Sequence, residues 1–93
     1  MVVGFLLLEI YLPYSHSLKE KRKRLKSIRD KLKNRYNVAF AEVDYQDKWQ
    51  RSTIGVVTLN NQKEYLETVF IKIVEDAEKI IDGEILNYEI QYF

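Results

Sequence analysis

The chain has one histidine, His16, which lies between two serines; Asp44 and Asp47 occur later in the sequence. An imidazole beside a carboxylate is a common pair for general acid–base catalysis. A histidine at a helix start, however, often orders the loop, and the positive end of the helix dipole disfavours its charged form. We therefore expect a structural or binding role for His16 and name no catalytic residue. An enzyme that uses His16 with Asp44 or Asp47 stays an alternative.

Three acidic residues, Glu42, Asp44 and Asp47, are spaced closely enough to be considered as oxygen ligands for a divalent cation. Their spacing matches no known metal-binding loop, and the chain has no cysteine for thiolate sites or disulfides. We therefore predict no metal and no cofactor, and expect these acids to form ion pairs. The basic residues expected opposite them are Lys19, Arg22 and Arg51.

Positive charge is concentrated in one segment of the chain. Residues 19–35 contain ten basic residues and two acids, a net charge of +8, whereas the rest of the chain carries −7. A basic patch favours an anionic partner such as RNA or an acidic protein surface. The alternative is a solvated helix face that pairs with acids of the second helix. The candidate nucleic-acid contacts are Lys19, Lys21, Arg22, Lys23, Arg24, Lys26, Arg29 and Arg51.

Trp49, the only tryptophan, falls in an expected hairpin rather than in a core strand. Its ring could stack on a base or anchor a partner, or it could fold over the loop and cover the end of the core. The following strand, residues 52–57, lacks the aromatic pattern with which RNA-recognition domains bind bases on a sheet. RNA contacts are therefore expected from the helix and its neighbouring loops.

Periodicity predicts six elements that position these residues. Expected strands cover residues 2–12, 38–45, 50–59 and 85–93, and expected helices cover residues 17–34 and 61–82, with a hairpin at 46–49. Ser17 with Glu20 has the spacing of a capping box, as does Asn61 with Glu64. The first helix has a narrow apolar stripe of Leu18, Leu25, Ile28 and Leu32.

This order predicts an α+β fold: one ferredoxin-like β-α-β-β-α-β domain over residues 1–93. The four-stranded antiparallel sheet is expected in the order 4-1-3-2, with two helices on one face. Right-handed crossovers then bring segments 15–22 and 44–51 to one edge of the molecule. The candidate residues of this motif edge are Ser15, His16, Ser17, Asp44, Gln46, Asp47, Trp49 and Gln50.

The two motif segments also carry a family resemblance. Ser15 to Arg22, with Glu42 to Asp44 and Gln46 to Arg51, closely resembles the YlxP-like family of small bacterial proteins of unknown function. The resemblance extends over the whole chain and implies a ferredoxin-like fold. Genes of that family often lie near those for translation initiation and ribosome-binding factor A, which implies an association with the ribosome. It brings no catalytic residues.

The sheet face opposite the helices is expected to carry Phe5, Leu7, Val38 and Phe40. A face this apolar is more often a protein contact than bare surface, so a homodimer or a docked partner is expected there. No secretory signal or membrane-spanning segment is recognised, and a cytoplasmic location is expected. The sequence thus favours a non-enzymatic RNA- or ribosome-associated module, with a protein-interaction domain as the alternative and no small-molecule substrate.

Overall fold

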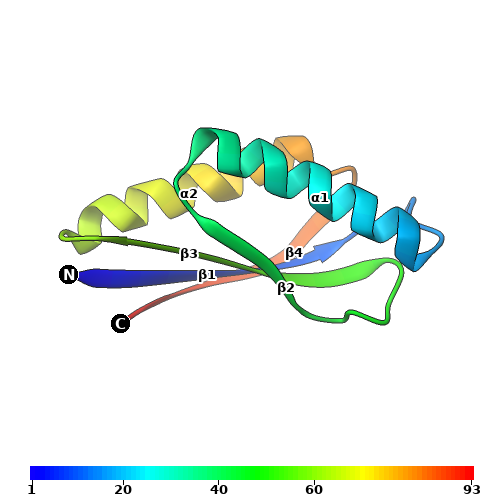
Figure 1. Cartoon of the computed structure of the whole chain (residues 1–93), viewed down its shortest axis with the longest axis horizontal. Helices are drawn as coiled ribbons and strands as arrows, with labels where there is room; N and C mark the ends of the chain where they lie inside the picture. The colour runs from blue at the N-terminus through cyan, green and yellow to red at the C-terminus, as the bar shows by residue number, and fades with distance from the viewer.

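Six elements follow one another in the order β-α-β-β-α-β in a computed structural model that describes all residues, 1–93 (Figure 1). The four strands are β1 (Val2–Tyr11), β2 (Ala39–Asp44), β3 (Arg51–Asn60) and β4 (Glu84–Tyr92), and the two helices are α1 (Leu18–Arg35) and α2 (Lys63–Ile80). Each lies within a few residues of its predicted range. Neither helix has the length and apolarity needed to cross a membrane.

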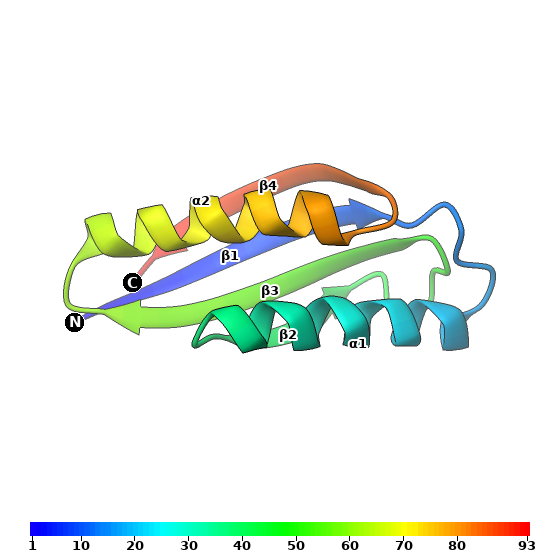
Figure 2. The ribbon, with the colours of Figure 1, turned by 90° about the horizontal axis from the view of Figure 1, so that it is seen from above.

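The strands form one antiparallel sheet in the order β2-β3-β1-β4, which confirms the predicted ferredoxin-like topology. Both helices lie on the same face of this sheet, so the molecule has two layers (Figures 1 and 2). Figure 2 shows α2 along β1 and β4, and α1 along β2 and β3. The other face of the sheet has no covering element.

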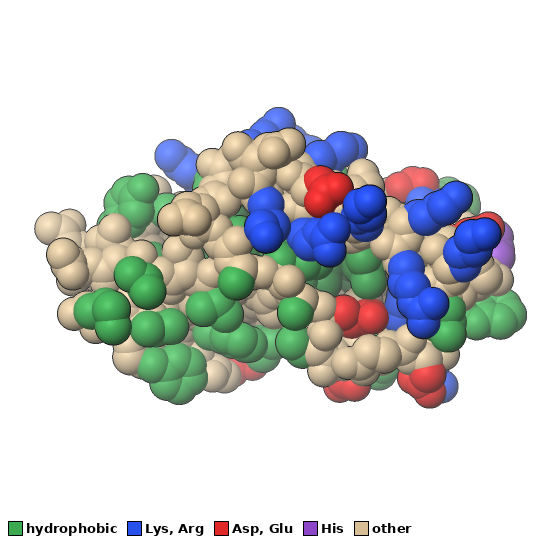
Figure 3. Space-filling model, viewed as in Figure 1, with side chains coloured by type: hydrophobic (Ala, Val, Ile, Leu, Met, Phe, Trp, Pro, Cys, Tyr) green, Lys and Arg blue, Asp and Glu red, His purple; other side chains and the backbone are tan.

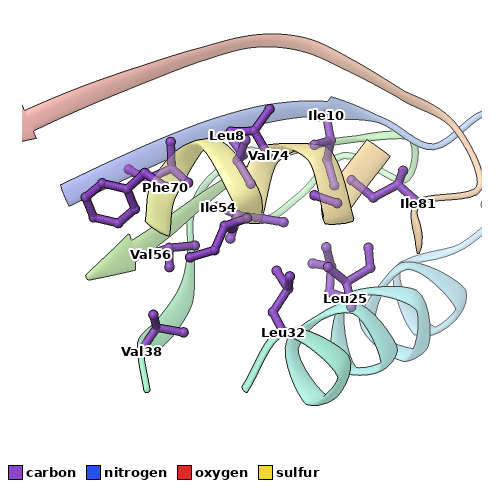
Figure 4. Close-up of a cluster of buried hydrophobic side chains, with 14 of the residues drawn as sticks. Leu8, Ile10, Leu25, Leu32, Val38, Ile54, Val56, Phe70, Val74 and Ile81 are labelled. Carbon is purple, nitrogen blue, oxygen red and sulfur yellow. The ribbon is translucent and has the colours of Figure 1, made fainter. Parts of the chain in front are cut away.

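Side-chain alternation separates the two faces of the sheet. In β1, Leu6, Leu8 and Ile10 are fully buried beneath the helices, whereas Phe5 and Leu7 are half-buried on the open face. Leu25 and Leu32 of α1 point toward the same core (Figure 4). The sequence pattern therefore predicts the faces of β1 correctly.

The predicted open face is wrong for Phe40 of β2 and for Val38, which directly precedes β2. Phe40 lies opposite the fully buried Val56 of β3, and cross-strand partners share one face of a sheet. Phe40 accordingly packs against the core, and Val38 belongs to the core with 8% exposure. The apolar open face is completed instead by other residues: Val3, Ala39, Ala41, Val43, Val57 and Leu59.

The start of α2 and the pairing of β4 depart from a regular pattern. The N-cap of α2 is Gln62, whose side chain makes no capping hydrogen bond, so the predicted capping box of Asn61 with Glu64 is wrong. The Asn60 side chain accepts a hydrogen bond from the Gln62 N–H (2.9 Å) just before the helix. In β4, a register shift between Glu9 and Ile10 of β1 interrupts the alternation. This bulge places Ile85 against the core and leaves Leu86 exposed.

Candidate functional site

The first turn of α1 follows the loop after β1. Side chains of this loop and turn form hydrogen bonds with nearby backbone groups. The Ser17 hydroxyl accepts a hydrogen bond from the Glu20 N–H (3.0 Å), as the capping box predicts. The Glu20 carboxylate reaches one residue further back than expected and accepts from the His16 N–H (2.6 Å). Ser15 is buried beneath this turn, and its hydroxyl donates to the Ser17 carbonyl (3.4 Å). The turn is therefore fixed before any ligand arrives.

Lys21 is buried between α1 and the β2–β3 hairpin, with 1% exposure. Its ammonium group lies 2.9 Å from the Glu42 carboxylate and donates to the Tyr45 carbonyl at 2.6 Å and the Arg51 carbonyl at 3.4 Å. Glu42 also accepts a hydrogen bond from Ser52 at 2.6 Å. All three donors of the ammonium thus have partners, as a buried charge requires.

The prediction of Lys21 as a nucleic-acid contact is therefore wrong, because its charge is neither exposed nor unpaired. The helical spacing explains its position. Lys21 lies three residues after Leu18 and four before Leu25, inside the stripe that faces the sheet. Lys21 instead positions the loop between β2 and β3.

The β2–β3 loop, residues 45–50, forms the second half of the motif edge. Tyr45 adopts a left-handed backbone conformation with a φ of 61°, and its carbonyl also accepts the Lys48 N–H at 3.0 Å. Leu12 donates its N–H to the Gln50 carbonyl (2.7 Å), and the Gln50 side chain donates to the Pro13 carbonyl (3.1 Å). The segments after β1 and β2 therefore meet, as the topology predicts.

Arg51 follows this loop, and its guanidinium group stacks on the Tyr45 ring. Its guanidinium carbon lies 4.8 Å from the centre of the Tyr45 ring, which is within cation–π distance. It also pairs with Glu9, and this hydrogen bond raises the pKa of Arg51 above its ordinary value. Arg51 is therefore always charged but already has a carboxylate partner.

The loop lines a hollow of about 530 Å³ that is open to solvent. Its lining consists of Tyr45, Asp47, Lys48, Trp49, Gln50 and Arg51. Trp49 is 54% exposed, so its ring does not close off the core. Gln46 is exposed beside the hollow and has no hydrogen bond from its side chain.

His16 is exposed at the motif edge, and no hydrogen bond joins its ring to Asp44 or Asp47. Asp44 accepts a hydrogen bond from the Tyr45 N–H at 2.7 Å. Glu42, Asp44 and Asp47 do not gather into a group that could hold a metal ion. The ion pairs also differ from those expected. Glu42 pairs with Lys21, which was not among its expected partners. Arg51 pairs with Glu9 and not with an acid of the hairpin.

The basic residues of α1 divide into paired and unpaired groups. Four of the ten have a carboxylate within 4 Å: Lys21 with Glu42, Arg24 with Asp82, Arg29 with Asp30, and Arg35 with Asp76. The other six have none; we call them the free cations of α1. They are Lys19, Arg22, Lys23, Lys26, Lys31 and Lys33. Only two of the paired residues, Arg24 and Arg35, contact acids in or after α2.

All six free cations are exposed on the surface of α1. Figure 3 shows basic side chains in a row along α1, above a recess that opens toward β2. This groove has a volume of about 340 Å³. It is lined on the helix by Arg22, Leu25, Lys26 and Arg29, and on the strand by Phe40, Ala41 and Glu42. The basic side chains of this groove therefore all come from α1.

A third polar cluster ties the end of α1 to α2 and was not predicted. Tyr36, directly after α1, donates its hydroxyl to Asp76, which also pairs with Arg35 (3.3 Å). Partial burial and then this hydrogen bond raise the pKa of Tyr36 to about 12. The same hydrogen bond, with the pairing to Arg35, lowers the pKa of Asp76. The cluster is structural, because every group in it is already paired.

Comparison with known proteins identifies relatives over most of the chain. Residues 3–90 match the profile of the family described as "Protein of unknown function (DUF503)". The uncharacterized protein YlxP of Bacillus subtilis (strain 168) is 37% identical over 62 residues, which are 67% of each chain. This likeness confirms the predicted YlxP-like resemblance.

Two solved structures, both of designed proteins, share the fold at low sequence identity. The designed protein LFR1 1, with a ferredoxin fold, matches with a TM-score of 0.56 and 10% identity, over 100% of this chain and 83% of that one. The designed protein Foldit4 matches with a TM-score of 0.54 and 15% identity, over 99% and 94% of the two chains. Fold and sequence agree, and the chain belongs to the DUF503 family of proteins of unknown function.

Proposed function

We propose that this protein binds RNA, and that the free cations of α1 contact the phosphate backbone. The observation that supports this is the absence of carboxylate partners around six exposed basic residues on one helix. Like charges held this close repel one another, and a polyanion relieves the repulsion while it releases its own counterions. The resemblance to a family whose genes often lie near that for ribosome-binding factor A is the reason to propose RNA as the polyanion.

Such contacts position an RNA without reading its sequence, because phosphates are the same at every nucleotide. We propose that the protein acts as a binding module. Arg22 and Lys26 line the groove beside β2, and Lys33 lines a second hollow that shares Phe40 with it. These three are the expected central contacts. Lys21 makes no contact with RNA and acts only by holding the hairpin in place.

The test measures binding of ribosomal RNA fragments by fluorescence anisotropy at several salt concentrations. Replacement of two free cations, Lys26→Gln with Lys33→Gln, is expected to weaken binding at low salt. It should also reduce the slope of log affinity against log salt by roughly 1.5, since each lost phosphate contact contributes about 0.7–0.9.

The matched control is Lys72→Gln with Lys79→Gln, which removes the same charge from the exposed surface of α2. This variant is expected to bind as the wild type does. Equal losses in both double variants would mean that net charge alone drives binding, and the α1 surface would no longer be the site. No binding by the wild type at low salt would overturn the proposal.

A second candidate function is self-association through the open sheet face, which we propose from its uncovered apolar side chains. Val43 and Leu59 are 44% and 59% exposed there, and Phe5 and Leu7 lie between them. Burial of such a patch is favourable by about 25 cal/mol per Å². Sedimentation at micromolar concentration should show a dimer that Leu59→Asp dissociates; a strict monomer would overturn this candidate.

A further inference from the structure

The hollow of the β2–β3 loop contains features that phosphate binding alone does not use. It has an exposed indole, Trp49, and an aromatic ring, Tyr45, already covered on one side by Arg51. The volume of about 530 Å³ falls within the range of ordinary ligand pockets. Its opening to solvent suits a flat group that enters from outside.

The loop that presents Trp49 is held from three directions. The Lys21 ammonium binds the Tyr45 carbonyl, the Leu12 N–H binds the Gln50 carbonyl, and the Gln50 side chain binds the Pro13 carbonyl. These contacts flank Trp49 on both sides in the sequence. A large aromatic side chain is thus kept in water on a fixed backbone, so binding need not order the loop first.

The chemistry of the hollow fits a nucleobase. The indole offers a π-face of the kind on which bases stack in proteins that bind single strands. Lys48 adds donors and Asp47 adds acceptors at the rim, which match the mixed polar edge of a base. The loop that lines the hollow contacts the first turns of α1, since the Lys21 ammonium donates to the Tyr45 carbonyl at 2.6 Å.

We propose that this hollow takes an unpaired nucleobase, stacked on Trp49, of an RNA whose phosphates lie on α1. This inference rests on the proposed RNA binding and adds the class of RNA that the protein binds. The preferred RNA is single-stranded or bulged, because bases inside a continuous duplex are stacked on each other and present no free face. A regular A-form helix would meet only the cations.

The test uses three RNA probes of about twelve nucleotides, a length within the usual site sizes of single-strand binders. They are a mixed-sequence single strand, the same strand with abasic sites in place of every base, and a blunt duplex. Anisotropy gives the affinity of each probe. Because Trp49 is the only tryptophan, quenching of the indole fluorescence reports contact at this residue alone.

The wild type is expected to prefer the single strand over the abasic strand and the duplex, and only the single strand should quench Trp49. Trp49→Ala should weaken single-strand binding about tenfold, with little change for the other two probes. The control, Tyr65→Ala, removes an exposed aromatic residue on α2 and should leave all three affinities unchanged. Circular dichroism establishes that both variants fold.

The outcomes separate this inference from the proposed function. If Lys26→Gln with Lys33→Gln weakens all probes but Trp49→Ala binds the single strand as the wild type does, the hollow takes no base and phosphate binding stands. If Trp49→Ala weakens all three probes equally, Trp49 acts through the fold and the inference fails. If the wild type binds none of the probes at low salt, both proposals fail.

Discussion

Two adjacent residues of α1, Lys21 and Arg22, have the same charge and opposite environments. Lys21 faces the sheet, is almost fully buried, and has a carboxylate and two carbonyls as partners. Arg22 is exposed and has no carboxylate within 4 Å. The helix thus has an inner side on which charge is satisfied and an outer side on which it is not. The environment of a cation, and not its type, decides whether it holds the fold or remains available to a ligand.

The largest expected effect on stability comes from a substitution on the inner side of α1. Lys21→Ala should lower the free energy of unfolding by about 3–5 kcal/mol, because removal of one partner leaves Glu42 as an unpaired, largely buried charge. Urea denaturation followed by circular dichroism measures this loss. A cost below about 1 kcal/mol, the usual value of an exposed pair, would contradict the assigned role of Lys21.

The double variant Lys21→Met with Glu42→Leu sharpens this prediction. Apolar replacement of both members of a buried pair is often close to neutral, so the double variant should regain most of the stability that Lys21→Ala loses. The loop, however, would no longer be held by an ammonium. Trp49 fluorescence should therefore show a more mobile side chain even when stability is restored.

The next effect is expected at the end of α1. Tyr36→Phe removes the hydroxyl that donates to Asp76 and should cost about 1–2 kcal/mol, the range for a hydrogen bond to a charged group reduced by partial exposure. Thermal unfolding of the two proteins measures the difference. An unchanged melting temperature would mean that water replaces the hydroxyl without loss.

A smaller, pH-dependent effect is expected from Asp76. Its folded pKa lies below the ordinary value near 4, so the contribution of its carboxylate is present above that pH and is lost as the pH falls through the folded value. The stability gap between the wild type and Asp76→Asn should therefore shrink in acid, below about pH 4. A stability gap that stays constant from neutral pH to pH 2 would contradict the lowered pKa of Asp76.

The smallest effect on stability is expected from the outer side of α1. Lys26→Gln should change the free energy of unfolding by less than about 0.5 kcal/mol, because an exposed side chain with no partner leaves nothing unsatisfied behind. Its effect should appear only in RNA binding. A loss as large as that of Lys21→Ala would remove the distinction between the two sides of the helix.

The sequence predicts the elements and topology well because alternation in β1 and the stripe of α1 follow directly from burial. It fails at Lys21 because composition places this residue with nine other cations, although its position inside the stripe between Leu18 and Leu25 indicates burial. Glu42 carries a matching signal, since it follows Val38 and Phe40 on the core side of β2. Two charged residues on facing apolar surfaces could have been paired from the sequence alone.

Other features depend on contacts that no local pattern contains. The faces of β2 could not be assigned because its alternation is weak and its register is set by pairing with β3. The bulge between β1 and β4 and the Tyr36–Asp76 hydrogen bond join residues far apart in the chain. The hollow around Trp49 likewise depends on the loop conformation, with Tyr45 in the left-handed region.

The contact between Lys21 and the hairpin also has a kinetic consequence. Loops of this length usually open many times for each global unfolding event, so their amides exchange with solvent quickly. Here the loop can open only if the Tyr45 carbonyl leaves the buried Lys21 ammonium, which couples the motion of the loop to the first turns of α1. The Lys48 amide, hydrogen-bonded within the loop, should then exchange at a rate close to that of the α1 amides, as though the hairpin were part of the helix.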